Sequence, residues 1–265
     1  MTPAVPVGEL LRSWRTRRRL SQLELATTST VSQRHLSWLE SGKAMPSREM
    51  ILKLAKHLAI PHRDRNALLV AAGLAPIYRE RSLEDPAMAP VLALVQRVLA
   101  GYEPSPALAV NRHWELVSAN AGLAPLMRLI NPRLLVPPIN VLRLSLHPEG
   151  LGPHIVNYEE WREHIIARLL AQQQAAPDAE LSALIEELKA YAAPPGARAT
   201  EIDTSLSGIA VPLELRSPDG QILRFLSCTT VFGTPVDITL SELAIEAFLP
   251  ADAATAAHLA AQAVS

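Results

Sequence analysis

The stretch SQLELATTSTVSQRHLSWLESGK, residues 21–43, constrains the fold more than any other part of the chain. Ser21 stands where the N-cap of a helix belongs, and Glu24 completes a capping box three residues later. Ser32 repeats the start signal, and Gly42 suits the left-handed residue that ends a helix. The pattern predicts two short helices with a tight turn between them, in which one residue adopts its conformation without the freedom of glycine. The helices are expected over 22–28 and 33–41.

Three further helices are expected around this pair, because apolar residues recur at helical spacing on both sides of it. The first 75 residues hold 12 Lys and Arg against 5 Asp and Glu, whereas the remaining 190 hold 13 against 21. A basic segment joined to an acidic one suggests that the first part binds a polyanion and the second does another job. The three additional helices are predicted over 7–20, from Ser47 to the break at Pro61, and over 63–72.

The same segment carries a family pattern. The motifs S-Q-x-E-L-A and V-S-x-x-x-L-S-x-L-E-x-G-K are followed in register by P-S and L-x-K-L-A. This run resembles the Cro/phage-repressor type of helix-turn-helix domain, the XRE family. The resemblance implies an all-α domain of five helices over residues 1–75, with the third helix entering the major groove of double-stranded DNA.

The resemblance also implies which side chains meet the DNA. Arg34 is the best candidate for a base contact, through guanine O6 and N7. Trp38 departs from the polar residue usual at its position, and it either packs on a thymine methyl or stacks elsewhere in the domain. Arg15 and Glu40 are implied to form a structural ion pair. The predicted DNA-binding residues are Gln22, Ser32, Gln33, Arg34, His35, Ser37, Trp38 and Lys43.

A run of arginines in the first expected helix has two readings. It is either a solvated basic face, as most charge runs are, or a set of phosphate contacts beside the helix pair. The residues are Arg12, Arg15, Arg17, Arg18 and Arg19.

Residues 76–90 have proline at each end and charges between, which is typical of a linker. From 91 to 265 the order of apolar patterns is helix, two strands, helices and three strands. This order predicts an α+β domain with a five-stranded antiparallel sheet and helices on one side of it. The strands are expected at 107–110, 114–119, 209–217, 221–232 and 238–248.

A second, looser resemblance covers this domain. The runs W-E-L-V-S-A-N and N-V-L-R-L-S-L-H-P, with Trp161 in the helix that follows, resemble the ligand-binding domain of MmyB-like transcription regulators. In that family a PAS-like domain follows an XRE helix-turn-helix, and long-chain, fatty-acid-like ligands are associated with its pocket. The resemblance implies that Trp114 and Asn120 lie at the second strand and its following helix, and that Asn140, Arg143 and His147 lie in the segment that crosses the sheet.

A sensor pocket needs aliphatic lining with a few polar groups. Arg143 lies between two leucines, so it either holds an acidic head group or forms a salt bridge to one of the domain's acids. The predicted ligand-binding residues are Trp114, Asn120, Leu142, Arg143, Leu144, His147, Trp161, Ile165 and Phe225, with Leu146, Leu169 and Phe232 as further lining and plain core as the alternative for each apolar residue.

Other chemistry finds little support in the pattern. His147, His154 and His164 are spaced by seven and ten residues, which does not form a metal motif, and no catalytic signature is present. We therefore expect neither an enzyme nor a cofactor or metal. The one cysteine, Cys228, is interpreted as inert core and fits a reducing cytoplasm. No apolar run reaches the roughly 18–20 residues that a membrane span needs.

Together these patterns predict a sequence-specific transcriptional regulator of the bacterial cytoplasm. We expect a homodimer on a pseudo-palindromic operator, with an apolar, fatty-acid-like ligand bound in residues 91–265 and its effect transmitted through 76–90. The alternative is an adaptor or antitoxin-like regulator whose C-terminal domain only dimerises and binds no ligand.

Overall fold

The computed structural model describes residues 5–195 and 210–262, and it divides into two compact units. The first unit runs to Arg81 and includes residues 234–241, and the second comprises 82–233 and 242–265. This division differs from the predicted boundaries of 1–75, 76–90 and 91–265. Residues 76–81 and the late segment 234–241 fall in the first unit, and residues 82–90 fall in the second.

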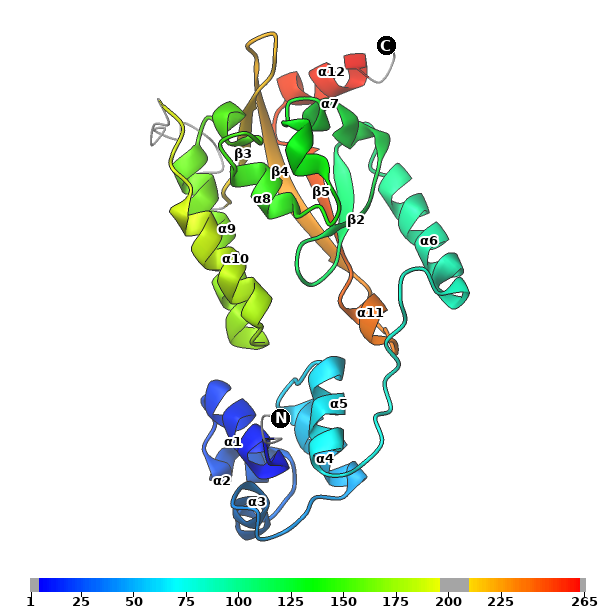
Figure 1. Cartoon of the computed structure of the whole chain (residues 1–265), viewed down its shortest axis with the longest axis vertical. Helices are drawn as coiled ribbons and strands as arrows, with labels where there is room; N and C mark the ends of the chain where they lie inside the picture. Colours follow the sequence, from blue (N-terminus) through cyan, green and yellow to red (C-terminus); the bar gives the residue numbers. More distant parts are fainter. Residues whose placement is uncertain (1–4, 196–209, 263–265) are drawn as a thin grey trace. The chain divides into compact units, whose positions relative to one another are not determined.

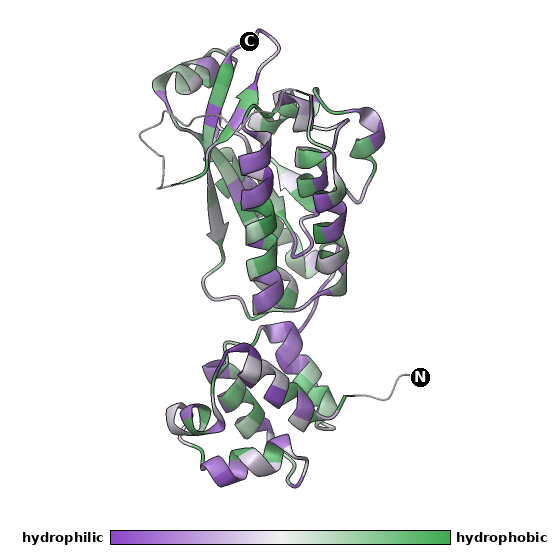
Figure 2. Cartoon of the chain, turned by 90° about the vertical axis from the view of Figure 1, so that its left-hand side faces the viewer, coloured by the Kyte–Doolittle hydropathy of each residue, from purple (hydrophilic) through white to green (hydrophobic). Residues whose placement is uncertain are grey.

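The first unit is helical, as predicted (Figure 1). Its core consists of leucine and isoleucine side chains that are fully buried, among them Leu36, Leu39 and Leu54. In Figure 2 its helices alternate between hydrophobic and hydrophilic residues, which is the pattern of helices that bury one face. The helices are α1 (Val7–Arg17), α2 (Gln22–Thr28), α3 (Gln33–Glu40), α4 (Arg48–His57), α5 (His62–Ala71) and α11 (Ile238–Ser241).

The helix ends follow the local signals in the sequence. Ser21 and Glu24 form the predicted capping box, and Gly42 has φ 73° after α3. The turn between α2 and α3 places Thr30 at φ 51°, which is the residue without glycine's freedom that the sequence predicted. The first helix ends at Arg17 rather than at residue 20, because the chain turns back through Arg19 at φ 55°.

Helices α1 and α3 cross in backbone contact at Gly8. A Cβ atom at that position would lie 2.3 Å from the carbonyl oxygen of Leu39 and 2.9 Å from that of Glu40. Beside this crossing, Arg15 Nε lies 2.6 Å from Glu40 Oε1, and Nη2 lies 2.9 Å from Oε2. The ion pair implied by the XRE resemblance is therefore present, and it locks α1 to the end of α3.

Residues 238–248 were expected to form a single strand, and this expectation is wrong in its first part. Ile238–Ser241 is the helix α11, and the strand β5 starts only at Ala244. Asp237 caps this helix by accepting from Thr239 N at 2.9 Å. Two further bonds hold the segment from outside: Ile238 N donates to Arg79 O at 2.8 Å, and the Asp237 carboxylate accepts from Arg81 Nη1 at 2.6 Å. These bonds attach 234–241 to the end of the first unit's own chain.

The second unit contains the predicted five-stranded antiparallel sheet, in the order β2-β1-β5-β4-β3. The predicted start of the third strand, residue 209, lies outside the described residues. The strands are β1 (Ala107–Val110), β2 (Leu116–Ala119), β3 (Leu213–Arg216), β4 (Ile222–Val231) and β5 (Ala244–Pro250). The helices are η1 (Pro86–Met88), α6 (Ala89–Ala100), η2 (Ala121–Leu123), α7 (Ala124–Met127), η3 (Pro132–Leu135), α8 (Val141–Leu146), η4 (Gly152–His154), α9 (Tyr158–Ala175), α10 (Ala179–Ala190) and α12 (Ala253–Gln262).

Helices cover both faces of this sheet, so the expectation of helices on one side is wrong (Figure 1). Ala107 and Ala109 of β1 pack with Val95 and Leu99 of α6. The alternate residue Leu108 faces a larger cluster that α8, α9 and α10 complete. Because successive strand residues point to opposite faces, the short apolar strand β1 is buried on both sides.

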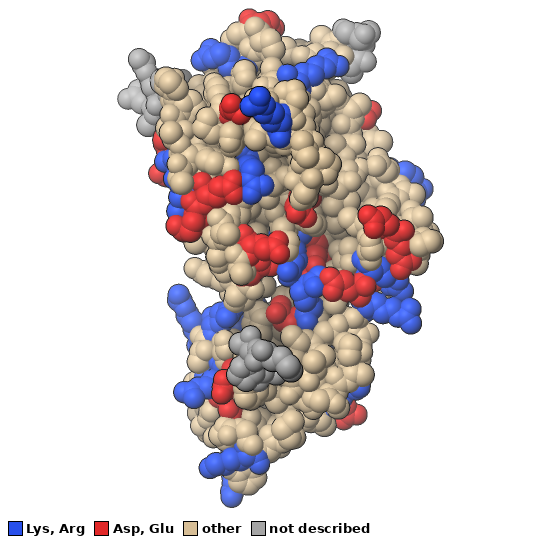
Figure 3. Space-filling view, viewed as in Figure 1, with Lys and Arg blue, Asp and Glu red and all other residues tan. Residues whose placement is uncertain are grey.

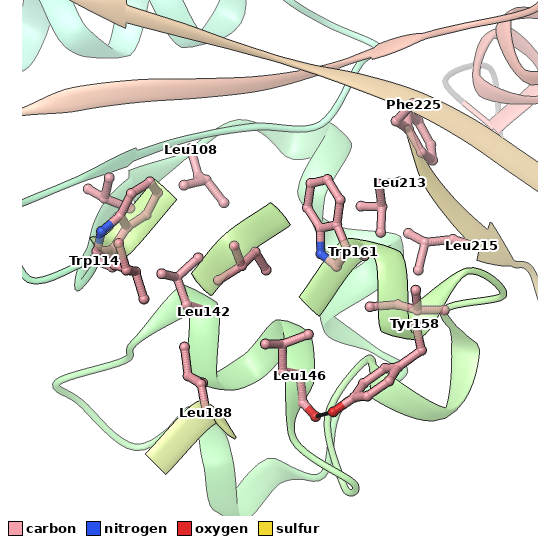
Figure 4. Close-up of a cluster of buried hydrophobic side chains, with 14 of the residues drawn as sticks. Leu108, Trp114, Leu142, Leu146, Tyr158, Trp161, Leu188, Leu213, Leu215 and Phe225 are labelled. Carbon is pink, nitrogen blue, oxygen red and sulfur yellow. Dashed lines mark hydrogen bonds between the residues drawn. The ribbon is translucent and has the colours of Figure 1, made fainter. Parts of the chain in front are cut away.

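The larger cluster is the main core of the second unit (Figure 4). Trp114, Trp161 and Phe225 point into it, and Tyr158 Oη donates to the carbonyl oxygen of Leu146 at 2.9 Å. Cys228 is exposed on β4, so its interpretation as core is wrong. The strand β4 continues beyond the helices there, and its last residues lose their cover.

Candidate functional site

The outer face of α3 is the first candidate site. Gln33, Arg34 and Trp38 are exposed there, while Leu36 and Leu39 are completely buried on the opposite side. Lys43 is exposed just past the helix, and Ser32 caps its start by accepting from His35 N at 3.2 Å. His35 and Ser37 are half-buried at the edges of this face, so all of these predicted residues lie on or beside one helix.

Arg34 and Trp38 are in contact on this face. The Arg34 guanidinium lies 4.6 Å from the centroid of the Trp38 ring, which remains 40% exposed. The two are one helical turn apart, so their side chains stack along the outside of α3. Both residues stay on the exposed face of α3, so the contact restrains the arginine without removing the tryptophan from the surface.

Glu40, the last residue of α3, binds side chains of α1 and α2. Besides the two bonds from Arg15, it accepts from Gln22 Nε2 at 2.8 Å, and Arg15 Nη1 donates to Leu20 O at 2.7 Å. The side chains of Arg15 and Glu40 are only 10% and 3% exposed. Gln22, predicted as a phosphate contact, is thus held in place by Glu40. The second hydrogen of its side-chain amide remains to donate to a phosphate.

The arginine run does not behave as one set, and two of its members fit neither of the two interpretations. Arg15 is buried in the ion pair, and Arg18 donates to the carbonyl oxygens of Leu58 and Ala59, so both have structural partners. Arg12 and Arg19 are exposed. On the face drawn in Figure 3, the charged side chains of the first unit are more often basic than acidic, which suits a polyanion.

The second candidate site is a cavity of about 80 Å³ in the second unit. Its walls come from all five strands, from α8 and α9 and from residues 123–130, and most of the lining side chains are apolar. Six of the predicted ligand-binding residues line it: Trp114, Leu142, Leu144, Trp161, Ile165 and Phe225. A second space of about 200 Å³ shares Leu126 and Phe225 with it, so these two side chains separate the cavities.

Both tryptophans in the wall have satisfied indole N–H groups. Trp114 Nε1 donates to Gln172 Oε1 at 3.0 Å, and Trp161 Nε1 donates to Ser145 Oγ at 3.1 Å. Trp114 has φ 65°, a left-handed conformation that costs an aromatic residue roughly 1–2 kcal/mol. The turn between β1 and β2 accounts for this conformation, because Trp114 N donates to Asn111 O at 3.0 Å where the chain reverses.

Two charged side chains lie together at one corner of the cavity wall. Arg168 of α9 forms a two-bond ion pair with Glu246 of β5 and donates to Thr229 Oγ1 at 2.6 Å. Its guanidinium also lies 4.6 Å from the centroid of the Trp114 ring. His164 stacks on Trp161 beside the pair, and burial, together with the Arg168 cation, lowers the pKa of this histidine below its ordinary value. His164 is therefore neutral near pH 7.

Three predicted ligand-binding residues lie outside the cavity lining. Arg143 pairs with Glu187 through two bonds of 2.6 and 2.7 Å, which is the salt bridge that the sequence analysis left open. Asn120 holds the backbone around β1, accepting from Ala107 N at 2.9 Å. His147 accepts from Glu149 N at 3.0 Å. Of the further lining residues, Leu146 and Leu169 are core, and Phe232 packs on the opposite face of the sheet.

The sequence analysis missed the polar members of the wall, namely Ser145, His164, Arg168, Ser227 and Glu246. A signal existed for two of them. Arg168 lies on the apolar side of its helix, and Glu246 interrupts the apolar strand AIEAFLP. A charge on each of two buried faces predicts a mutual ion pair, since an isolated buried charge is too costly.

Within residues 5–195 and 210–262, no group of three or more His, Cys, Asp or Glu side chains is arranged to hold a metal ion. In the same residues, no helix has the length and apolarity to span a membrane.

Comparison with protein families gives two matches. Residues 91–261 match the ligand-binding domain of MmyB-like transcription regulators, and residues 6–68 match a helix-turn-helix domain. Both are domains of transcription regulators. The comparison with curated proteins gives no match.

Proposed function

The chain belongs to the MmyB-like transcription regulators, and from this premise we propose that it recognises a specific operator through α3 and responds to an apolar, acyl-chain ligand in the cavity of its second unit. The observation that carries the proposal is the exposed α3 face, whose helix is held rigidly by the Arg15–Glu40 pair. We further propose that it acts in the cytoplasm as a homodimer, which doubles the length of sequence that one domain reads. Sedimentation of the full chain with and without operator DNA tests the dimer.

Arg34 is the proposed base-reading residue. Its guanidinium is held against Trp38, so little side-chain entropy is lost when it binds guanine. We expect Arg34→Ala to weaken operator binding by about 1–3 kcal/mol, with almost no change on random DNA. Arg97→Ala, an exposed arginine on α6, is the matched control and should leave both affinities unchanged. Equal losses on operator and random DNA would reassign Arg34 to a phosphate contact.

The proposed ligand is fatty-acid-like, with one alkyl chain. A space of about 80 Å³ is small beside the roughly 300–1,000 Å³ of typical ligand sites, so the wall must yield to a long chain. Leu126 and Phe225 are the side chains that would move, because the larger second space lies directly behind them. A thermal-shift series of C8–C18 compounds tests this, and no shift with any of them would favour the adaptor reading instead.

We propose that the ligand signal reaches the first unit by more than the predicted 76–90 connection. Residues 234–241 fold with the first unit, while their two ends continue into β4 and β5, which carry Phe225 and Glu246 of the cavity wall. Asp237 fastens this segment through Arg81. We expect Asp237→Asn to reduce the change in operator affinity on adding ligand, whereas Asp219→Asn, in the exposed β3–β4 turn, should preserve it. An unchanged response in both variants would leave 76–90 as the route.

A further inference from the structure

At the charged corner of the cavity, the positive charge of Arg168 and the negative charge of Glu246 cancel each other. Glu246 is 4% exposed at its side chain and receives two hydrogen bonds from Arg168. Thr229, its directly opposite partner on β4, accepts a third bond from the same guanidinium. Arg168 and Glu246 are the only Lys, Arg, Asp or Glu side chains among the described residues that line the cavity. The pair therefore adds no net charge to an apolar space.

A second ion pair in the same unit shows what a purely structural bond of this kind looks like. Glu214 of β3 is 7% exposed at its side chain and accepts from Arg224 Nε at 3.0 Å, and Arg224 is 37% exposed, against 31% for Arg168. Neither Glu214 nor Arg224 lines either cavity. Both pairs join an arginine to a buried glutamate, although Arg224 gives Glu214 one bond and also pairs with Asp252 at 3.4 Å. Of the two pairs, only Arg168–Glu246 faces the space where a ligand would lie.

The remaining polar groups in the wall are uncharged. Ser145 has its own hydroxyl hydrogen after accepting from Trp161, Ser227 offers a second hydroxyl, and His164 is a neutral imidazole. These groups donate and accept hydrogen bonds without contributing charge. They suit a head group that both donates and accepts hydrogen bonds. A charged head group beside the Arg168–Glu246 pair would find no counter-ion among them.

A ligand carboxylate in this corner would compete with Glu246 for one guanidinium. Two carboxylates that share a site repel each other, so one of them must take up a proton or leave. Displacing Glu246 is also unfavourable, because it is buried on a central strand and would lose its partner.

We propose that the cavity selects an alkyl ligand with an uncharged, hydrogen-bonding head group, such as an alcohol or a primary amide, over the free carboxylate of the same chain length. This inference rests on the proposed ligand-binding function and specifies the chemical class of its ligand.

The experiment compares 1-dodecanol, dodecanamide and dodecanoate, each below its aggregation limit, in calorimetric titrations of the full chain at pH 7.5. We expect the alcohol and the amide to bind about tenfold or more tightly than the acid, the factor that corresponds to 1.4 kcal/mol of binding free energy. Acid binding that equals or exceeds that of the neutral compounds overturns the inference and leaves the ligand-binding function standing. Failure of all three to bind overturns both.

Glu246→Gln tests the cause independently. Removing the carboxylate leaves the Arg168 cation to the ligand, so the preference should reverse towards dodecanoate. Glu214→Gln, the matched control, should retain the wild-type preference because its pair does not face the cavity. A wild-type preference for the neutral compounds that persists in Glu246→Gln would overturn the role assigned to the ion pair.

Discussion

Each unit of this protein contains a buried glutamate held by two hydrogen bonds from an arginine, and the two pairs differ in their surroundings. Arg15–Glu40 is sealed between helices and is completed by Gln22 and by the carbonyl oxygen of Leu20. Arg168–Glu246 lies at the wall of a cavity and under the ring of Trp114. An ion pair of the same kind thus fastens two helices in one unit and lines a cavity in the other, depending on what is packed around it.

Removal of Glu40 should have the largest effect. Glu40→Ala leaves Arg15 buried without its counter-charge, and breaking such a pair typically costs about 3–5 kcal/mol. We expect the first unit to unfold at markedly lower urea concentration, with loss of operator binding, while ligand binding in the second unit survives. Glu49→Ala, an exposed residue on α4, should change stability by less than about 0.5 kcal/mol. A small effect of Glu40→Ala would show that water or a neighbour compensates Arg15, and the contrast between the pairs would fail.

The close backbone contact between α1 and α3 is tested next by Gly8→Ala. The new methyl group would lie 2.3 Å from the Leu39 carbonyl oxygen, so α1 and α3 must separate. Overpacking of this kind costs about 1–3 kcal/mol and should weaken operator binding along with stability. The control is Gly233→Ala, whose Cβ would meet nothing within 4 Å. Urea denaturation followed by circular dichroism measures both, and equal stabilities would contradict the backbone contact.

The wall between the two cavities of the second unit is tested by Leu126→Ala. This side chain stands between two spaces, so we expect its loss to cost less than the roughly 2–5 kcal/mol of an ordinary buried leucine. Joining the spaces should favour longer ligands, since each methylene that finds room contributes about 0.8 kcal/mol. Titration with C10 and C16 alcohols measures the change in chain-length preference. Leu170→Ala, exposed on α9, should not alter it.

The smallest expected effect is that of pH. Burial lowers the pKa of His62 in the first unit, where it stacks on Tyr78, and of His164 in the second. The unfolded chain then binds protons near pH 6.5 that the folded chain does not, so stability falls as the pH drops below that value. Thermal melts from pH 7.5 to 5.5 should show this decline, and His164→Gln should reduce it for the second unit only. A decline of the same size in His164→Gln would assign the effect to other groups.

The first unit could be predicted almost completely, because its signals are local. Ser21 and Ser32 cap their helices through the next few residues, and Gly42 ends α3 by its own backbone freedom. The predicted residues of α3 lie on one exposed face for the same reason, since spacing along a helix sets direction. Arg15–Glu40 needed the XRE resemblance, because 25 residues separate the partners.

Prediction was poorer where long-range pairing decides the outcome. The sequence left Arg143 between an acidic head group and a salt bridge, and Glu187, from another helix, decides for the salt bridge. Residues 238–241 have strand-like composition, yet Asp237 caps them as a helix, and Ile238 N donates to the distant Arg79 O rather than to a neighbouring strand. The cavity residues that were predicted, such as Trp161 and Phe225, are large and apolar, and such residues enter a core in almost any packing.

The helix-turn-helix with its exposed face and the five-stranded domain could be derived from the sequence, because caps, turns and periodicity act within a few residues. The folded chain was needed to show that 234–241 belongs with the first unit and that helices cover both faces of the sheet. It was also needed to show that Arg168 meets Glu246 at the cavity, across 78 residues of chain. The energy of a buried charge depends on which partner the whole fold brings to it, and no local pattern contains that information.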